Sequence, residues 1–427
     1  MKKLLPLAFW LTLILAVASC QKNDHPLTTI ADNYSNAVIL QWNEAATIAA
    51  TRGGTLPPMS ESRIYAMVNV AVHDALNNIV KKYATYALTT TPDVSTNPDA
   101  AVAQAAHDVI VALLPPQQVY ADSLLTVTLA AIPAGPAKDQ GTALGKASAQ
   151  AMLGKRGGDG ASTAQYPVVD GIIPGQYQST PPFAAGFTSL PGWGKVTPWA
   201  LTSAAQFRPV PPYAVNSQQY TDDFTDVKAL GCPTCPARSA DQTQLGVFWL
   251  ENIPSSWNRI ARILIGQKGL KGWETARVLA LLHMAEADAN IGVFDAKFFY
   301  NYWRPITAVR LGDTDGNGGT AGDAGWNILA PPTPPVPDYP SNHAGDGGAA
   351  AELLKNYFGK DEWSFTVKST TLPDVTRSFT SLSQAATEVA LSRIYVGFHF
   401  KNAVVAGEDM GRKIGKYVLE NSLLPVK

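Results

Sequence analysis

Most of this chain consists of alanine-rich segments in which apolar residues recur every three or four positions. This is the period of an α-helix with one buried face. Prolines and glycines bound these segments, and runs with the alternation typical of β-strands are rare. Because 46% of the residues are hydrophobic, the chain can build a large core and is not disordered. We therefore predict an all-α protein of helical bundles joined by long, ordered Pro/Gly-rich loops.

The helical pattern is found in several separate segments. The predicted helices are 60–79, 100–114, 121–132, 143–153, 242–250, 273–302, 347–358, 380–393 and 404–419. The longest connection, 167–213, contains aromatic residues, and we expect it to pack on the helices instead of standing free. A second long connection runs over 311–340.

The N-terminus has the pattern of an export signal. Lys2 and Lys3 precede an apolar run over residues 4–17, which is shorter than the roughly 20 residues of a membrane span. Val-Ala-Ser-Cys follows at 17–20 and resembles a bacterial lipobox, in which the chain is cleaved before Cys20 and the cysteine is lipidated. The alternative is an ordinary signal peptide with a chance cysteine.

This pattern predicts the location of the protein. Residues 1–19 form a lipoprotein signal peptide, and 20–35 form a tether that contains His25. The mature protein is expected to be exported and lipid-anchored in a bacterial envelope, at the outer membrane, periplasmic or surface-facing. Its only membrane contact would be the anchor, since no later stretch reaches 18 apolar residues.

Charge and cysteines exclude other classes. A net charge of −1 argues against a nucleic-acid-binding surface, which needs a basic excess. Cys232 and Cys235 form a CxxC pair that could be a redox dithiol, half of a zinc site or a loop disulfide. A zinc site would need further ligands, and the sequence has no second CxxC and no CxxH. Prolines flank the pair, which argues against a redox motif that opens a helix. In an exported protein we therefore predict a loop disulfide. The sequence does not indicate an oligomeric state.

Two cations introduce the first chemical cluster. Lys297 and Arg304 are seven residues apart, so on one continuous helix they would share a face two turns apart, with Pro305 at its end or bend. Aromatic residues surround them, and two cations on such a face need an anion. The alternative is a pair of long side chains that extend from an amphipathic helix into solvent.

The second cluster is Pro340-Ser341-Asn342-His343. Ser341 is a plausible N-cap of the alanine-rich helix that follows. Free backbone amides at such a start bind oxyanions, and a hydroxyl and an imidazole add a donor and a proton carrier. Alone, the cluster could equally be an ordinary capped helix with a nearby histidine.

The third cluster is Ser392-Arg393, followed by Gly397 and His399. Arg393 and His399 are six residues apart and would not share a face of a straight helix. We therefore expect a break near Gly397 that directs His399 towards the same site. The three clusters together supply three cations, a hydroxyl, two imidazoles and a helix N-terminus, which is a set suited to bind an oxyanion.

The order Lys-x6-Arg-Pro, Pro-Ser-x-His, Ser-Arg-x5-His resembles the signature of the superfamily of type 2 phosphatidic acid phosphatases and vanadium-dependent haloperoxidases. Segments 71–75, 193–198, 207–213, 288–310 and 392–400 are similar to the bacterial haloperoxidase-related branch. The resemblance covers most of the mature chain and favours that branch over the small phosphatases. It implies a helical catalytic bundle over 261–427, preceded by a helical part with long loops over 36–260.

The resemblance also implies a role for each site residue. Lys297, Arg304 and Arg393 match the cationic ligands of bound phosphate or vanadate, and Ser341 matches a hydroxyl donor. Asn342 stands where the motif has glycine, but only the backbone amide is needed there.

The two histidines of the motif have different implied roles. His343 matches the general acid–base. His399 matches the apical histidine, which bonds vanadium in a haloperoxidase and is the nucleophile in a phosphatase. Val336 and Phe294, near this motif, have no titratable group, and we assign no halide.

We therefore predict an enzyme that binds vanadate and uses hydrogen peroxide to oxidise a halide. An acid phosphatase that acts on phosphate esters through a phosphohistidine at the same site is the alternative. A third hypothesis is an anion-binding surface lipoprotein without catalysis, against which both retained histidines argue.

The remaining motifs have simpler interpretations. Asp313-Thr-Asp315-Gly-Asn317-Gly318 matches the first half of a calcium loop, but Ala324 stands where a bidentate glutamate is expected, so a polar turn is favoured over a calcium site. The histidines outside the clusters are expected to be packed, hydrogen-bonded residues of helices; they are His73, His107 and His283.

Overall fold

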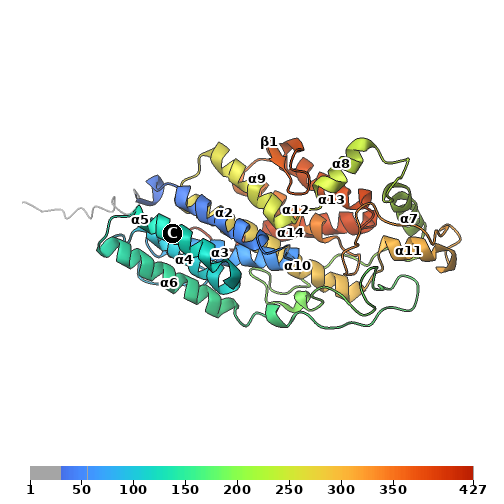
Figure 1. Cartoon of the computed structure of the whole chain (residues 1–427), viewed down its shortest axis with the longest axis horizontal. Helices are drawn as coiled ribbons and strands as arrows, with labels where there is room; N and C mark the ends of the chain where they lie inside the picture. The colour runs from blue at the N-terminus through green and yellow to red at the C-terminus, as the bar shows by residue number, and fades with distance from the viewer. Residues whose placement is uncertain (1–29, 55, 427) are drawn as a thin grey trace, which may run out of the picture.

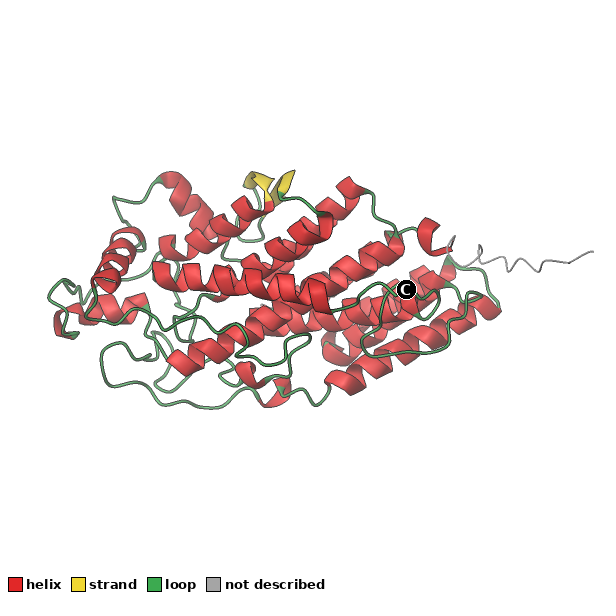
Figure 2. Ribbon diagram, turned by 180° about the vertical axis from the view of Figure 1, so that it is seen from behind, coloured by secondary structure: helices red, strands yellow, loops and turns green. Residues whose placement is uncertain are grey.

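The computed structural model describes residues 30–54 and 56–426. The predicted signal peptide, Cys20 and His25 lie outside these residues. Within the described residues the protein is helical apart from one small antiparallel hairpin (Figure 2). The elements are α2 (Ala37–Thr51), α3 (Pro58–Asn77), α4 (Pro98–Leu113), α5 (Gln118–Ala130), α6 (Pro136–Arg156), α7 (Gln218–Leu230), α8 (Ala240–Phe248), α9 (Ile253–Lys268), α10 (Gly272–Tyr300), α11 (Pro305–Leu311), α12 (Asn342–Phe358), β1 (Glu362–Lys368), β2 (Thr376–Ser381), α13 (Leu382–Tyr395) and α14 (Lys401–Asn421).

The predicted all-α class is confirmed, and each predicted segment corresponds to a helix. The helices α2, α7, α9 and α11 were not predicted. The hairpin was also missed, although β1 alternates strictly between exposed and buried residues. Among the described residues, none of the helices has both the length and the apolar character needed to cross a membrane.

Helix α10 is the central element of the molecule. Figure 1 shows α2 to α6 towards one end, α7 and α11 at the other, and α10 reaching from one group towards the other. Nearly every residue of α10 from Trp273 to Phe294 is buried, since the helix packs against both α3 and α12. The chain boundary predicted at 260/261 falls inside α9, and the main core contains residues from both sides of it. The two predicted parts therefore share one core through α10.

Helices α12 and α14 cross at very short distance because α14 carries glycines on the shared face. A Cβ atom at Gly411 would lie 2.0 Å from the carbonyl oxygen of Gly345, and one at Gly415 would lie 2.2 Å from that of Ala349. Any side chain at these positions would force the helices apart. The backbone amide of Ser341, at the start of α12, also donates to the carbonyl of Ala403 at 2.8 Å. The N-terminus of α12 is thereby held firmly in the core.

The described end of the predicted tether is packed on the domain. Residues 30–33 form a helical turn, and Ala31 is fully buried. The ring of Tyr34 lies 5.4 Å from that of Trp273, and its hydroxyl donates to Asp99 at 2.6 Å. The prediction of a tether over 20–35 is therefore wrong for residues 30–35, because apolar and aromatic side chains of this segment pack against the helices.

Candidate active site

The first two cations reach the site from different elements. Lys297 lies in the last turn of α10, which ends at Tyr300, and Asn301 follows with a left-handed φ of 49°. Arg304 lies beyond this break in extended backbone, immediately before α11. The prediction that Lys297 and Arg304 share a face of one helix is wrong, because the chain turns between them. Both side chains nevertheless line the same cavity.

Lys297 and Arg304 are fully buried and bind backbone carbonyls. The Nζ of Lys297 donates to the carbonyls of Pro337 at 2.6 Å and Asp338 at 3.0 Å. The Nε of Arg304 donates to Val336 at 2.7 Å, and its Nη1 donates to Phe398 at 2.9 Å. Arg304 therefore connects the loop before α12 to the segment that carries His399.

Ser341 occupies the N-cap position of α12, as predicted, but its hydroxyl does not cap the helix. Its backbone is extended, with φ −73° and ψ 128°, and no side-chain capping bond forms. The Ser341 Oγ is buried and has no hydrogen-bond partner, and the first intrahelical bond of α12 is made by the amide of Gly345. The hydroxyl and the preceding free amides of the first turn are therefore available to an anion.

Asn342 directs its amide nitrogen towards α10. The Nδ2 donates to the Oδ1 of Asn290 at 2.5 Å, and Asn290 in turn donates to the carboxylate of Asp346 at 2.9 Å. Asn342 also lines the cavity. Because its side chain is held by α10, the departure from glycine leaves the backbone amide at the helix start in position.

His343 follows in the first turn of α12 and is partly buried. Its Nε2 is inaccessible to solvent and has no hydrogen-bond partner. Burial lowers the pKa of His343 well below its usual value, and the nearby charge of Arg393 lowers this pKa further. The imidazole is therefore neutral in the absence of an anion and can accept a proton.

The third cluster has the predicted break. Helix α13 ends at Tyr395, and Gly397 has a φ of +80°. A Cβ at Gly397 would lie 2.7 Å from the carbonyl oxygen of Gly231, so both the backbone angle and the space require glycine. After this turn, His399 points back at Arg304, whose Nη1 lies 3.0 Å from its Nε2. Arg393 donates to the carbonyl of Trp249 at 3.0 Å, while its buried Nε has no partner.

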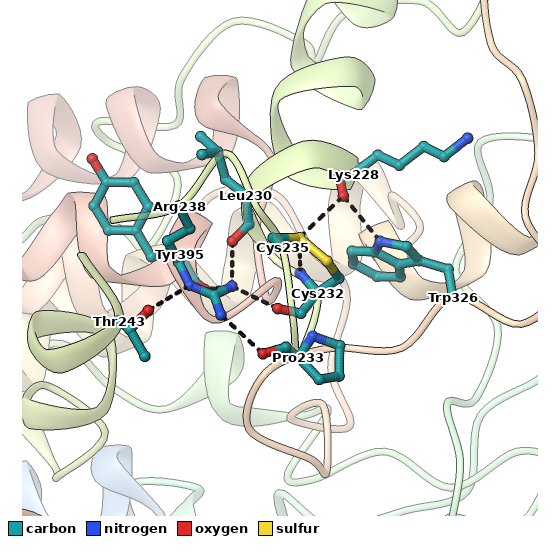
Figure 3. The surroundings of a disulfide bond; sticks show 9 residues. All are labelled: Lys228, Leu230, Cys232, Pro233, Cys235, Arg238, Thr243, Trp326 and Tyr395. Carbon is teal, nitrogen blue, oxygen red and sulfur yellow. Dashed lines mark hydrogen bonds between the residues drawn. A yellow bond between two sulfur atoms is a disulfide. The ribbon is translucent and has the colours of Figure 1, made fainter. Parts of the chain in front are cut away.

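A loop closed by a disulfide contacts the chain next to the turn at Gly397. Cys232 and Cys235, for which the sequence predicted a loop disulfide, are joined, with Cα atoms 5.2 Å apart. Figure 3 shows the guanidinium of Arg238 among the carbonyls of this loop. Its Nη1 donates to Cys232 at 2.6 Å and to Tyr395, the last residue of α13, at 3.3 Å. The loop is thereby attached to the chain just before Gly397.

The site has a strong local excess of positive charge. Burial lowers the pKa of Lys297 well below its usual value, and Arg304 lowers it further. Burial lowers the pKa of Arg393 to about 9, with Arg304 contributing. His399 is shifted in the same direction, by burial first and then by Arg304. Buried cations that repel one another are stabilised by an anion, which would raise these pKa values again.

The cations line a cavity of about 660 Å³ whose walls are otherwise largely apolar. Prolines of the 331–335 segment line it together with Phe183 and Phe187 of the long predicted loop. That loop therefore packs over the site, as its aromatic content suggested. The cavity contains Lys297, Arg304, Asn342, His343, Arg393 and His399. The structure thus brings together residues of all three clusters, although Ser341 is not among those that line the cavity.

The other histidines have structural partners. His73 is buried, and its Nε2 lies 3.1 Å from the carbonyl oxygen of Ala84. His283 is buried between Glu286 and Asn258. His107 lies between two carboxylates on α4 and α5, outside the cavity. Their assignment as packed, hydrogen-bonded residues is confirmed.

The segment that resembled half of a calcium loop forms a polar turn with internal hydrogen bonds. The Asp315 carboxylate accepts from the amide of Asn317 at 2.8 Å and from the hydroxyl of Thr320. The Asp313 carboxylate accepts from the amide of Gly322 at 2.8 Å. The aspartates of the motif therefore stabilise the turn by accepting hydrogen bonds from within it.

One site residue was missed by the sequence analysis. Asp338 lies three positions before Ser341 and is fully buried, with its Oδ1 2.8 Å from the Nδ1 of His399. No motif spacing connects Asp338 to His399, and the only signal in the sequence was its nearness to the Pro-Ser-x-His cluster.

Comparisons with known proteins show which proteins this chain is similar to. A family model of the second helical-bundle domain of vanadium chloroperoxidase matches residues 277–424. The chain is 24% identical over 288 residues, 52% of its length, to vanadium chloroperoxidase of Curvularia inaequalis. The alignment covers 47% of that relative, so the chain spans about half the length of the curated protein it matches.

Solved structures are similar over a larger part of the chain. The first bacterial vanadium-dependent iodoperoxidase superposes with a TM-score of 0.79 at 26% identity, covering 92% of this chain and 98% of that one. A bacterial vanadium-dependent chloroperoxidase in its holo form superposes with a TM-score of 0.68 at 18% identity, covering 86% and 92%. The helical fold is therefore that of the vanadium haloperoxidases.

Proposed function

Since the chain is similar to vanadium haloperoxidases in sequence and in fold, we propose that it binds vanadate and uses hydrogen peroxide to oxidise a halide. The observation that carries the proposal is the convergence of three buried cations on one cavity beside unpaired donors. Lys297, Arg304 and Arg393 supply the cations, and the Oγ of Ser341 and the Nε of Arg393 are buried without partners. Such a set fits a compact oxyanion of high charge.

The residues fit vanadate by charge and by donor type. The three cations would offset the charge on its oxygens, and Ser341 and the amides of the first turn of α12 would donate hydrogen bonds. His399 would supply the nitrogen ligand. When bound, vanadate supplies a Lewis-acid centre that activates hydrogen peroxide towards attack by a halide.

The protein's cations stabilise negative charge in the site, and His343 transfers protons. The cations act in a buried cavity, where electrostatic interactions are stronger than in water. The neutral Nε2 of His343 can take a proton from peroxide and return it to the departing oxygen. The apolar walls limit the access of water to the reacting groups. Overall, one proton, one peroxide and one halide give a hypohalous acid and water.

A paired assay on the purified protein tests this proposal. Halide oxidation is measured with vanadate and peroxide, using iodide, bromide and chloride separately, and phosphate-ester hydrolysis is measured without vanadate. We expect halide oxidation that depends on added vanadate, is lost when peroxide is omitted and is inhibited by excess inorganic phosphate. Hydrolysis without vanadate-dependent halide oxidation would favour the phosphatase alternative and reject the proposal.

We further propose that the mature protein is attached to a bacterial envelope membrane through lipidated Cys20. The sequence pattern supports this, with two lysines, an apolar run over 4–17 and the lipobox-like Val-Ala-Ser-Cys. In a bacterial host, the full chain should partition with membranes and Cys20→Ser should release it. The intact mass of the purified protein should include a diacylglyceryl group. Equal partitioning of both proteins with a chain mass free of lipid would contradict the anchor.

A further inference from the structure

A fully buried carboxylate lies beside the imidazole of His399. Asp338 precedes α12 and is held through its backbone, because its amide donates to the carbonyl of Tyr302 at 2.8 Å and its carbonyl accepts from Lys297. Its Oδ1 lies 2.8 Å from the Nδ1 of His399 and 3.8 Å from the Nη1 of Arg304. Asp338 therefore contacts three residues of the site.

The carboxylate of Asp338 lacks an aligned donor. Neither of its oxygens has a full hydrogen-bond partner, although the backbone amide of Phe400 faces it. A buried acceptor without a donor is costly. The Nδ1 of His399, 2.8 Å from Oδ1, is the ring nitrogen placed to supply that donor.

The contacts of His399 distinguish its two ring nitrogens through Asp338. The Nη1 of Arg304 lies within reach of both nitrogens, 3.0 Å from Nε2 and 3.3 Å from Nδ1, so this contact selects neither tautomer. The Oδ1 of Asp338 lies 2.8 Å from Nδ1, and a carboxylate at that distance favours a hydrogen on Nδ1. The lone pair of the neutral ring is then on Nε2.

We infer that Asp338 is the positioning residue of His399: it accepts the Nδ1 hydrogen and so presents the Nε2 lone pair to the bound oxyanion. The inference rests on the proposed function in taking vanadate as that oxyanion. A carboxylate in this position fixes the ring orientation and increases the basicity of the opposite nitrogen. Loss of such an outer partner of a metal-ligating histidine typically costs about 10- to 100-fold in affinity or activity.

Two variants and one control test the inference. Asp338→Ala removes the acceptor, and Asp338→Asn keeps an acceptor oxygen but loses the charge. Asp223→Asn is the control, because Asp223 is a buried carboxylate on α7 that accepts from the amide of Asn402, three residues after His399 in the chain. If Asp338 had only a structural role, its replacement should change vanadate affinity as little as the replacement of Asp223 does.

Two measurements are made on the full chain. Nitrogen-15 NMR of protein labelled at its six histidines gives the His399 tautomer, with the signal assigned by comparison with His399→Gln. Isothermal titration calorimetry gives the dissociation constants of vanadate and of inorganic phosphate. Circular dichroism and thermal melting confirm that each variant is folded.

We expect the Nδ1–H tautomer of His399 in the wild type and its loss in Asp338→Ala, with vanadate affinity about 10- to 100-fold weaker. The vanadate affinity of Asp338→Asn should lie between those of the wild type and of Asp338→Ala. Asp223→Asn should bind vanadate within about twofold of the wild type. An Nε2–H tautomer in the wild type would overturn the inference even if no variant folds. So would vanadate affinity in a folded Asp338→Ala that equals the control. If the wild type binds vanadate but oxidises no halide, the proposed function fails while the role of Asp338 is still tested by binding and tautomer.

Discussion

Replacement of His399 by alanine is expected to abolish vanadate-dependent halide oxidation and to weaken vanadate binding by more than about 100-fold. His399 is buried and lines the cavity, and because its Nδ1 lies 2.8 Å from the carboxylate of Asp338, its Nε2 is the nitrogen expected to bind the oxyanion. Loss of an outer partner alone costs about 10- to 100-fold, and loss of the ligand itself should exceed that. The measurements are steady-state halide oxidation and calorimetric titration with vanadate.

The matched control for this experiment is His107→Ala. His107 lies between carboxylates at the surface of α4 and α5 and does not line the cavity, so its removal should leave turnover and vanadate affinity unchanged. Thermal melting separates loss of function from loss of folding. Unchanged turnover in a folded His399→Ala would show that the proposed site is not the site of reaction.

Replacement of His343 by glutamine is expected to lower kcat by about 10²- to 10⁴-fold while vanadate affinity is largely retained. Positioned general acid–base groups contribute rate factors of this size. Glutamine keeps a polar group at the start of α12, where the backbone amides remain, but it cannot carry the proton. Burial and Arg393 hold the pKa of His343 low in the free protein, which keeps Nε2 ready to accept that proton.

The contrast between the two histidines is the critical result. His399→Ala should lose binding and turnover together, whereas His343→Gln should lose turnover alone. Imidazole added to His343→Ala should restore part of the activity, because the cavity of about 660 Å³ has room for it. Equal losses of vanadate affinity in both variants would instead assign His343 a ligand role and contradict its role as a proton carrier.

The two cations of the first cluster show how a sequence can predict the right residues for a wrong geometric reason. Their spacing suggested one continuous helix, but α10 ends at Tyr300 and Asn301 reverses the chain. Lys297 and Arg304 meet because carbonyls of the loop before α12 bind both of them. Helical period indicates a shared face only while the helix continues, and no residue pattern indicated a helix end before Pro305.

The missed helices have a related cause. Helix α2 begins after Asn36, whose side chain makes no capping bond, so its start has no local signal. Helix α9 has proline in its first turn and α7 is capped by Ser217, and these start signals were overlooked in the sequence. The strands β1 and β2 pair only with each other, and the alternation in β1 was overlooked because it covers a single short segment.

The sequence by itself determined the helical class, the three motif clusters and the need for a turn at Gly397, because these depend on local period, on spacing and on the conformational freedom of glycine. Only the tertiary structure decided how the clusters converge, that both predicted parts share a core around α10, and that Asp338 faces His399. The physical reason is that these contacts join residues far apart in the chain. Their distances depend on helix packing, such as the close crossing of α12 and α14, which local pattern does not specify.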